Sequence, residues 1–366
     1  MRTSPAPQEA GFRIGTNSSS LTLRTVYTSD LLDSASGAFS ADVSSLSSST
    51  TYYYQAFMTV SDGSGGYTEI VSSVRSFTTS APAAVLDRGY LDCYEVPAVS
   101  VLTHDSGAET FGSTKYHAYT TANARQRVVS HTFAYSGTKR NYSLLYDGDK
   151  HAALWVAFAM HADSYPWLVS RSDSWKADPA IPSSWQPNLS SGYQESSTYS
   201  RGHQVASNDR RTTTDQQKQT TYFSNMTPQI SGFNGGVWAT LEGDIQKIGN
   251  ATTASDTLYV VTGPVFGAGF GTTPDKDGLE CAVPTQYFKC IMKVSFSGST
   301  PTAAVGAAYL MNHASGAARQ EVTIDYIESL TGFDFFTNVP AALQNAAEAE
   351  THPTSYFPQK ATTTSE

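Results

Sequence analysis

The sequence has few cysteines and no long apolar segment. Three cysteines are too few for a disulfide framework, and Cys281 and Cys290 would pair only if the segment between them doubled back. Without that bridge we expect all three to be small buried apolar residues. The longest apolar run, ALWVAFAM at 153–160, is far shorter than the ~20 residues that a membrane helix needs. We therefore expect no membrane span.

Charged residues are also scarce, at 15% of the chain, and the formal net charge is −9. This balance argues against a broad basic face for nucleic acid, but it permits an enzyme that binds phosphate locally through a metal ion and a few arginines. Serine and threonine are abundant, which is typical of exported proteins. The start, MRTSPAPQEAG, lacks the apolar core of a signal peptide. We expect a secreted, periplasmic or cell-surface protein whose leader is absent from this chain.

The chain is long enough, at 366 residues, to predict two domains. Residues 1–80 contain short alternating runs, such as TYYYQAFMTV, between Ser-, Gly- and Asp-rich turns, which predicts an all-β region. Leu46 precedes Tyr52 in the chain, and Tyr52, Tyr54 and Ala56 then alternate onto one side. This arrangement resembles the corner of a fibronectin type III-like sandwich in which a tyrosine hydroxyl bonds to nearby backbone. Another small β-sandwich is the alternative.

The rest of the chain mixes strands and helices without regular alternation. TSAPAAVLD predicts a linker, placed at 81–89, and residues 90–345 predict a second domain of class α+β with a mixed or antiparallel sheet core. Within it, the apolar run DTLYVVTGPVFG predicts a buried strand. Residues 346–366 are predicted to be a C-terminal tail, disordered after Pro358.

Two helices are predicted near the end of this second domain. In FNGGVWATLEGDIQKIGN, apolar residues recur at helical spacing, Asn234 stands where it would cap the helix start, and Gly249 stands just past the expected end. DYIESLTGFDFF predicts a second, short amphipathic helix.

The histidines form no H-E-x-x-H or Cys–His zinc pattern. His203 differs from the other histidines in its sequence neighbours, because TYSRGHQVASNDR places arginines, an asparagine and an aspartate around it. For the remaining histidines we expect surface or structural roles: His104, His117, His131, His151, His161, His313 and His352.

An ordered set of motifs runs through residues 90–340. SRGH, NMTPQ and FNGGVW..LE follow one another, flanked by RNYSLLYD, LWVAFAM, SWKADPAIP, LYVVTGPVFG, VPTQYFK and GFDFF. Together they resemble the DNA/RNA non-specific endonuclease family, which includes secreted bacterial nucleases and mitochondrial endonuclease G. The resemblance implies a ββα-metal active site and hydrolysis of phosphodiester bonds in DNA and RNA.

The resemblance implies roles for three residues in particular. His203 matches the general base, for which a neutral imidazole with a pKa near ~6.5 is suited. Asn234 matches the direct ligand of a Mg²⁺ ion, with Mn²⁺ as the alternative metal, and Glu242 matches a carboxylate that acts on the ion through water. Taken singly, Asn234 would be a helix cap and Glu242 a solvated helix residue. Only their joint spacing with His203 indicates a site.

Four further residues receive supporting roles by the same resemblance. Asn225 matches an asparagine that fixes the site, and Gln229 matches a position with a structural or substrate-orienting role. Arg201 matches the motif arginine, which supports the site or contacts phosphate. Arg171 matches an arginine that stabilises charge in the transition state, although two extra residues separate it from the following tryptophan.

The sequence departs from the family pattern at two positions. Ser200 replaces the usual acid at the head of the motif, which removes any tuning of His203 by that carboxylate. Gln246 stands where relatives carry an arginine, so substrate binding is expected to be weaker. The favoured function is a metal-dependent, sugar-non-specific endonuclease that leaves 5′-phosphate ends. The alternatives are a surface binding protein on a degenerate nuclease fold and a phosphodiesterase for small nucleotides.

Overall fold

A computed structural model of the protein describes residues 7–21, 24–27, 50–79, 91–108 and 115–361, with positions 43 and 46. The chain divides into two compact units, Met1–Leu86 and Asp87–Glu366, which are described separately. The linker predicted at 81–89 lies outside the described residues. No described helix has both the length and the apolar character needed to cross a membrane.

The first unit contains a five-stranded antiparallel sheet, in which β1 and β3 are central and β5 pairs with β3. Its strands are β1 (Pro7–Gly15), β2 (Arg24–Tyr27), β3 (Thr51–Ser61), β4 (Tyr67–Val71) and β5 (Arg75–Thr78). Tyr52 is buried and its ring stacks on Phe77 at 5.9 Å, whereas Tyr54 and Ala56 are half-buried. Residues 28–42 lie outside the described part, so the fibronectin type III-like assignment stays a prediction.

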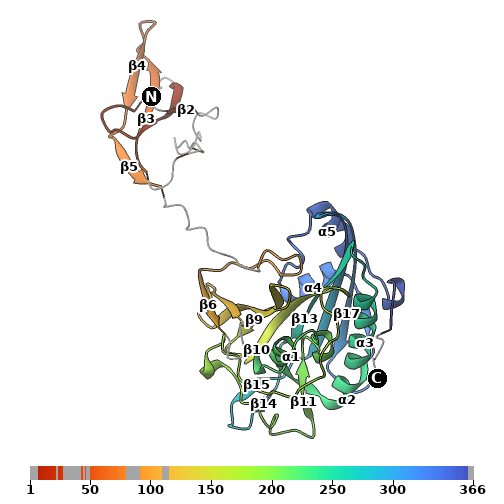
Figure 1. The fold of residues 1–366 in the computed structure, drawn as a ribbon. Helices are drawn as coiled ribbons and strands as arrows, with labels where there is room; N and C mark the ends of the chain where they lie inside the picture. The colour runs from red at the N-terminus through yellow and green to blue at the C-terminus, as the bar shows by residue number, and fades with distance from the viewer. Residues whose placement is uncertain are drawn as a thin grey trace. The chain divides into compact units, whose positions relative to one another are not determined.

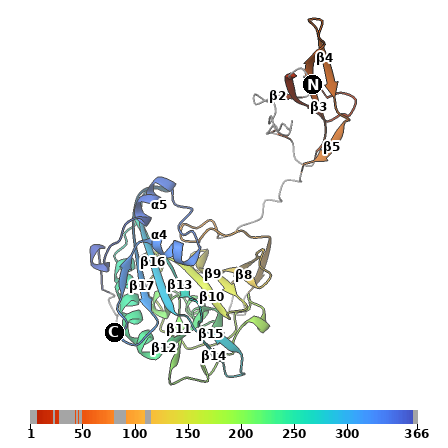
Figure 2. The same ribbon diagram turned by 180° about the vertical axis from the view of Figure 1, so that it is seen from behind.

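The second unit is built on a nine-stranded antiparallel sheet (Figures 1 and 2). The predicted strand DTLYVVTGPVFG is confirmed as β13, an interior strand of this sheet between β16 and β10. In spatial order the strands are β18 (Gln320–Val322), β17 (Thr300–Asn312), β16 (Gln286–Ser297), β13 (Asp256–Val265), β10 (Ala152–Met160), β9 (Thr138–Asp147), β8 (Gln126–Ala134), β7 (Lys115–Thr120) and β6 (Thr103–Ala108). The fold is therefore mixed α and β, rich in sheet and poor in helix.

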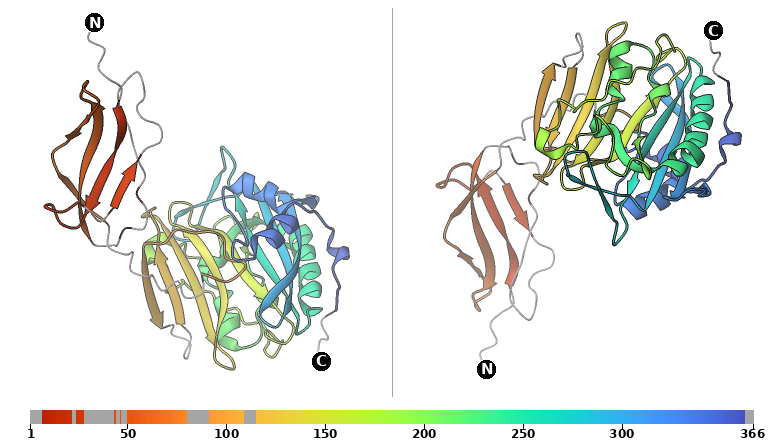
Figure 3. Two further views of the ribbon diagram at one scale, coloured as in Figure 1. Left: turned by 90° about the horizontal axis from the view of Figure 1, so that it is seen from above. Right: turned by 90° about the horizontal axis from the view of Figure 1, so that it is seen from below.

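Helices cover both faces of this sheet at β16 and β17. On one face, Tyr287 and Ile291 share a core cluster with Trp238, Leu241 and Ile245, which brings in helix α3 (Ala239–Asn250). Figure 3 shows α3, in green, alongside the blue strands.

The opposite face of β16 and β17 carries α4 (Ile324–Thr331) and α5 (Ala341–Glu348). Phe288 stacks on Phe335 there at 5.6 Å. A Cβ at Gly306 would overlap the Ala347 carbonyl, so a glycine is required for α5 to approach the sheet this closely. The predicted short helix is confirmed as α4, which ends at Gly332 with a φ of 74°.

The helix that follows the FNGG motif begins differently from the expected capped start. A short α2 (Ser231–Phe233) runs into a π-helical turn, η4 (Asn234–Trp238), and then into α3. Gly236 breaks the helical geometry inside η4, with φ −102° and ψ −110°. Asn234 therefore does not cap α3, which has no side-chain cap, and that prediction was wrong.

The end of α3 also differs from the expectation. Gly249 lies inside the helix rather than past its end, where a Cβ would come within 2.9 Å of the Met160 side chain. The glycine is thus a packing requirement of α3 and not its terminator.

The predicted C-terminal tail is ordered structure up to residue 361. Helix α5 extends to Glu348, past the predicted domain boundary, and is followed by the turn η5 (Thr354–Tyr356). Phe357 is buried in the cluster beside α3, and the Lys360 backbone N–H donates to the Lys247 carbonyl at 2.9 Å. Residues 346–361 are therefore part of the second unit, and the predicted tail was wrong for them.

The cysteines are free, so Cys281 and Cys290 do not form a bridge. Cys281, in β15 (Glu280–Ala282), packs with Leu189, Tyr193, Phe223 and Met226. Cys290 belongs to the face of β16 that carries α4 and α5. The two thiols are buried in different parts of the core.

Candidate active site

The SRGH and NMTPQ motifs form a two-stranded antiparallel ribbon. Strand β11 (Tyr199–His203) pairs with β12 (Met226–Ile230), and α2, η4 and α3 follow directly along the chain. Gln229 belongs to the partner strand β12, and its side chain lies over Gly202. A Cβ at Gly202 would overlap that side chain. The glycine of the motif is thus needed for the ribbon to pack. Along the chain, helix α1 (Thr214–Gln219) lies between the two paired strands, and α3 follows the second strand.

A cleft of about 550 Å³ opens beside this ribbon. Five of the seven predicted site residues line it, although they come from four separate segments: Arg171, Arg201, His203, Asn234 and Glu242. Asn225 and Gln229 do not line the cleft and are fully buried behind it. The structure therefore brings together the residues with predicted chemical roles and separates the two supporting amides from them.

His203 stands at the end of β11 with its Nε2 atom buried and without a hydrogen-bond partner among the described residues. Burial, followed by the nearby charges of Arg171 and Arg201, lowers the pKa of His203 to about 3. The imidazole is therefore neutral at physiological pH and keeps a lone pair free to accept a proton.

Glu242 lies in the first turn of α3, and its Oε1 atom is also buried without a partner among the described residues. Burial raises the pKa of Glu242, and the charge of Lys289 opposes that shift. Asn234 reaches the same cleft from η4, on the other side of the break at Gly236. An amide oxygen and a carboxylate oxygen at one cleft are hard donors of the type that Mg²⁺ prefers.

A second group of carboxylates lies elsewhere. Asp325, Glu328 and Glu348 bring oxygen atoms within 4.8 Å of one another on α4 and α5, away from the residues that line the cleft.

The two arginines of the cleft are held differently. Arg201 donates from Nη1 to the carbonyls of Leu189 and Ser190 at 3.0 and 3.2 Å, and its guanidinium lies 3.8 Å from the centre of the Trp175 ring. Arg171 has a half-exposed side chain that pairs with Asp173 at 3.2 Å. Arg201 is thus held at the cleft wall by two carbonyls and an aromatic ring, whereas Arg171 is held by an exposed ion pair.

Asn225 holds the backbone that follows His203. Its Oδ1 accepts from the Val205 N–H at 3.0 Å, and its Nδ2 donates to the Val205 and Thr220 carbonyls at 3.0 and 2.8 Å. Every polar atom of the amide is therefore used within the protein. This contact gives physical content to the supporting role predicted for Asn225.

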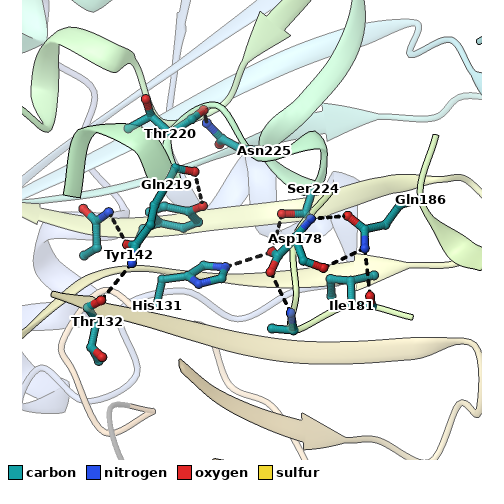
Figure 4. A network of polar contacts seen from close by, with 12 residues as sticks. His131, Thr132, Tyr142, Asp178, Ile181, Gln186, Gln219, Thr220, Ser224 and Asn225 are labelled. Carbon is teal, nitrogen blue, oxygen red and sulfur yellow. Dashed lines mark hydrogen bonds and ion pairs between the residues drawn. The ribbon is translucent and has the colours of Figure 1, made fainter. Parts of the chain in front are cut away.

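A buried polar network continues behind Asn225 (Figure 4). Ser224 donates to Asp178 Oδ2 at 2.5 Å, and His131 Nε2 lies 2.8 Å from the same oxygen. His131 and Asp178 are both almost completely buried. Sequence reasoning left His131 with a surface or structural role and did not find Asp178, because no motif spacing connects positions this far apart.

Two further residues that contact the backbone beside His203 were not predicted from the sequence. Trp238 Nε1 donates to the His203 carbonyl at 3.2 Å, and Lys289 Nζ donates to the Gln204 carbonyl at 3.3 Å. The signal for Lys289 was present in QYFKCIM, where a lysine interrupts a strand that is otherwise buried.

The two departures from the family pattern have local partners. Ser200 lies 3.0 Å from Ser231, hydroxyl to hydroxyl. Gln246 Nε2 donates to Asp209 Oδ1 at 3.1 Å, so its amide is bound to a neighbour within the cleft.

Comparison with known proteins identifies the class to which this fold and cleft belong. The model of the DNA/RNA non-specific endonuclease family matches residues 122–342. The chain belongs to this family of nucleases.

Several curated nucleases are similar to the chain. A nuclease of Nostoc sp. is 30% identical over 229 residues, covering 59% of this chain and 78% of that protein. A nuclease of Serratia marcescens is 29% identical over 215 residues, covering 57% and 77%. The mitochondrial nuclease EXOG of Mus musculus is 27% identical over 214 residues, covering 54% of this chain and 55% of that protein.

Among solved structures, a chain of the EndoG/EndoGI complex is 24% identical with a TM-score of 0.43, covering 58% of this chain and 88% of that chain.

Proposed function

We propose that this protein is an exported, Mg²⁺-dependent endonuclease that hydrolyses phosphodiester bonds of DNA and RNA without sequence preference. The observation that carries the proposal is the cleft itself, because it combines His203, Asn234 and Glu242 with two arginines. The family membership of residues 122–342 supports the same activity. Contacts aimed at phosphate rather than at base edges would account for the lack of sequence preference.

In this proposal His203 is the general base. Its buried Nε2, which has no hydrogen-bond partner among the described residues, would take the proton of the attacking water. Trp238 holds the backbone carbonyl of His203, which limits the positions that the imidazole can take. Proton transfer of this kind contributes on the order of 10²–10⁴-fold to a rate.

The metal would be held by the oxygen donors at the other side of the cleft. Asn234 would bind the ion directly, and Glu242 would accept hydrogen bonds from its water shell, which fits the partnerless Oε1 atom. When bound, Mg²⁺ would neutralise charge on the scissile phosphate and on the leaving oxygen. Mn²⁺ has similar ligand preferences and is the alternative metal.

The arginines would supply positive charge at the phosphate. Arg201 is fixed against Trp175 and two carbonyls, so it would form a static part of the phosphate site. Arg171 would exchange its exposed pairing with Asp173 for a phosphate oxygen as charge develops. Gln229 would not contact the substrate. It would affect the site only by packing against Gly202, which precedes His203.

The order β11, β12, α3 fits a ββα-metal site, and the all-β first unit would be a fibronectin type III-like accessory domain. We place the domains at 1–80 and 90–345, with residues 346–361 added to the second. An exported location is inferred from the composition alone. Detection of the mature protein in the medium or periplasm of its native cells, rather than in the cytoplasm, would support that location.

The direct test compares wild type, His203→Ala and His352→Ala on double-stranded DNA, single-stranded DNA and RNA, with Mg²⁺ and with EDTA. Wild type should cleave the polymers only with the metal, and His203→Ala should lose activity by about 10²–10⁴-fold. His352 pairs with Glu350 and does not line the cleft, so its variant should behave as wild type. Full activity of His203→Ala would rule out the mechanism.

A wild type that cleaves no polymer would rule out the nuclease activity. Binding of nucleic acid without cleavage would then indicate a surface binding protein. Preference for mononucleotide diesters would indicate a small-molecule phosphodiesterase.

A further inference from the structure

Lys289 is a buried basic side chain beneath the cleft, and the carboxyl groups of Glu242 and Asp209 act on it electrostatically. It lies in β16 on the same face as Tyr287 and Ile291, and its exposed fraction is 2%. Moving an ammonium group out of water is unfavourable unless its donors are satisfied. Burial lowers the pKa of Lys289, as expected for such a position. A lysine here therefore needs an explanation beyond the filling of space.

The contacts of the ammonium supply one. Lys289 Nζ donates to the Gln204 carbonyl and to Thr262 Oγ1, both at 3.3 Å, and lies 4.0 Å from the centre of the Trp238 ring. Thr262 is its direct register partner on β13, so the anchor for the lysine is built into the sheet.

Three successive carbonyls at the end of β11 each accept a side-chain donor. Trp238 Nε1 donates to His203 at 3.2 Å, Lys289 Nζ to Gln204 at 3.3 Å, and Asn225 Nδ2 to Val205 at 3.0 Å. The donors come from η3 (Phe223–Asn225), from η4 and from the distant strand β16. Because Lys289 also packs on the Trp238 ring, it acts on two of these three contacts.

We propose that Lys289 is a positioning residue for hydrolysis, which fixes the Gln204 carbonyl and the Trp238 ring and thereby the backbone that places His203 in the cleft. The proposal rests on the proposed function, because it assigns to Lys289 an effect on His203. A methionine would fill a similar volume without the desolvation cost, so packing alone does not call for the charge.

The test compares Lys289→Met with Lys293→Met in the full chain. Lys293 is a matched control, because it lies on the same face of β16 and pairs with Asp256 at 3.0 Å away from the cleft. Lys289→Met should lower kcat by about 10–100-fold through misplacement of the base. KM at saturating Mg²⁺ should change by less than about threefold, since no contact to the substrate is removed. Lys293→Met should keep the wild-type kcat.

A second measurement does not depend on activity. Amide hydrogen exchange in Lys289→Met should rise selectively at Gln204 and Val205, whose N–H groups bond to Asn225. Lys293→Met should not show this rise. Wild-type kcat and wild-type exchange in a folded Lys289→Met would overturn the proposal.

If Lys289→Met fails to fold, Trp238→Phe provides a second test, because it removes the Nε1 donor to the His203 carbonyl. Trp238 also hydrogen-bonds with Glu242, so the exchange measurement decides in this variant. It should lower kcat and raise exchange at the same amides, and wild-type behaviour in both would overturn the proposal. If both single variants fold, their double variant should lose less than the product of the single effects, because both side chains hold one backbone. Fully multiplicative losses would count against a shared role.

The failure of the proposed function would be recognised separately. In that case wild type and His203→Ala would be equally inactive, and the exchange pattern alone would decide whether Lys289 holds this backbone.

Discussion

The two faces of the nine-stranded sheet both bury carboxyl groups, and the difference between them separates a site from a structural contact. On the α3 face, Glu242 leaves one oxygen without a partner and lies at a cleft above Lys289. On the α4–α5 face, Glu328 accepts from the Phe335 N–H at 2.6 Å and Glu348 accepts from Gln344 at 3.1 Å.

Burial raises the pKa of the carboxyl groups on both faces, of Glu328 to about 7 and of Glu348 to about 8. A shifted pKa therefore does not identify a catalytic group by itself. The distinguishing features are a polar atom without a partner among the described residues, an opening to solvent and a nearby opposite charge. Of these three described carboxyl groups, Glu242 alone combines them.

The largest difference expected between the two faces concerns Glu242 and Glu348. Glu242→Gln keeps the shape of the side chain but removes its charge, so we expect nuclease activity to fall on the order of 10–100-fold. Glu348→Gln should leave activity within about twofold of wild type, because surface and structural changes away from a site have small effects. Initial rates on one DNA substrate at several Mg²⁺ concentrations measure both. Equal losses of nuclease activity in the two variants would show that the two faces of the sheet do not differ in function.

A second prediction concerns the supporting layer of the α3 face. Asn225→Ala leaves the Val205 N–H without its buried acceptor, which should cost about 1–3 kcal/mol of unfolding free energy. We also expect kcat to fall, because the same backbone carries His203. Urea unfolding and initial rates report the two effects. A loss of stability with unchanged kcat would show that the position of His203 tolerates a loose Val205.

The third prediction concerns pH and the α4–α5 face. The pKa of Glu348 in the folded protein is about 8, against an ordinary value of 4.5, because of burial and then of Glu328, with smaller effects from Asp325 and Asp334. The folded protein thus keeps a proton that the unfolded chain releases. The contribution to stability is complete below the ordinary pKa and is lost as the pH rises to about 8.

Glu348→Gln never ionises and should therefore be more stable than wild type near pH 9, by about 1 kcal/mol or roughly 2–4 °C in Tm. Near pH 4, where the carboxyl is protonated in both states, the two proteins should have about the same Tm. Calorimetry at the two pH values tests this. A gain of equal size at both would point to packing rather than ionisation.

The smallest effect is expected at the rim of the cleft. Gln246→Arg would place a cation beside Asp209 and the phosphate path, and we expect KM to fall about two- to fivefold at low salt, as for an exposed ion pair. The gain should shrink at high ionic strength. A KM that does not depend on salt would show that the new charge remains paired with Asp209.

The grouping of three site residues at one cleft was predictable because their motifs resemble those of a known nuclease family. His203, Asn234 and Glu242 belong to motifs whose order along the chain brings them to one cleft. Strand β13 was predictable from an apolar run, and α4 from its amphipathic pattern and the glycine after it. For the strand and the helix the information lies within a short segment.

The remainder depends on contacts between distant segments. The register of β13 and β16 decides that Lys289 meets Thr262 and Gln204, and no local pattern encodes that register. The cap predicted at Asn234 was wrong because two glycines allow a π-helical turn at the point where a capped start was expected. Such a turn depends on how α2 and α3 pack against the rest of the protein, and helix propensity carries no information about that packing.

The segment after α5 has a practical consequence for the design of shortened proteins. A fragment that stops at residue 345, where the sequence pattern suggested a boundary, would lack Phe357 and the Lys360 contact to α3. It would also lack Thr354, which hydrogen-bonds to Asp244 in the same helix. Such a fragment would keep every residue of the proposed chemistry, yet it would expose one side of the helix that carries Glu242. If such a fragment were inactive, the loss of packing against α3 would explain it. The result would not contradict the function proposed for the cleft.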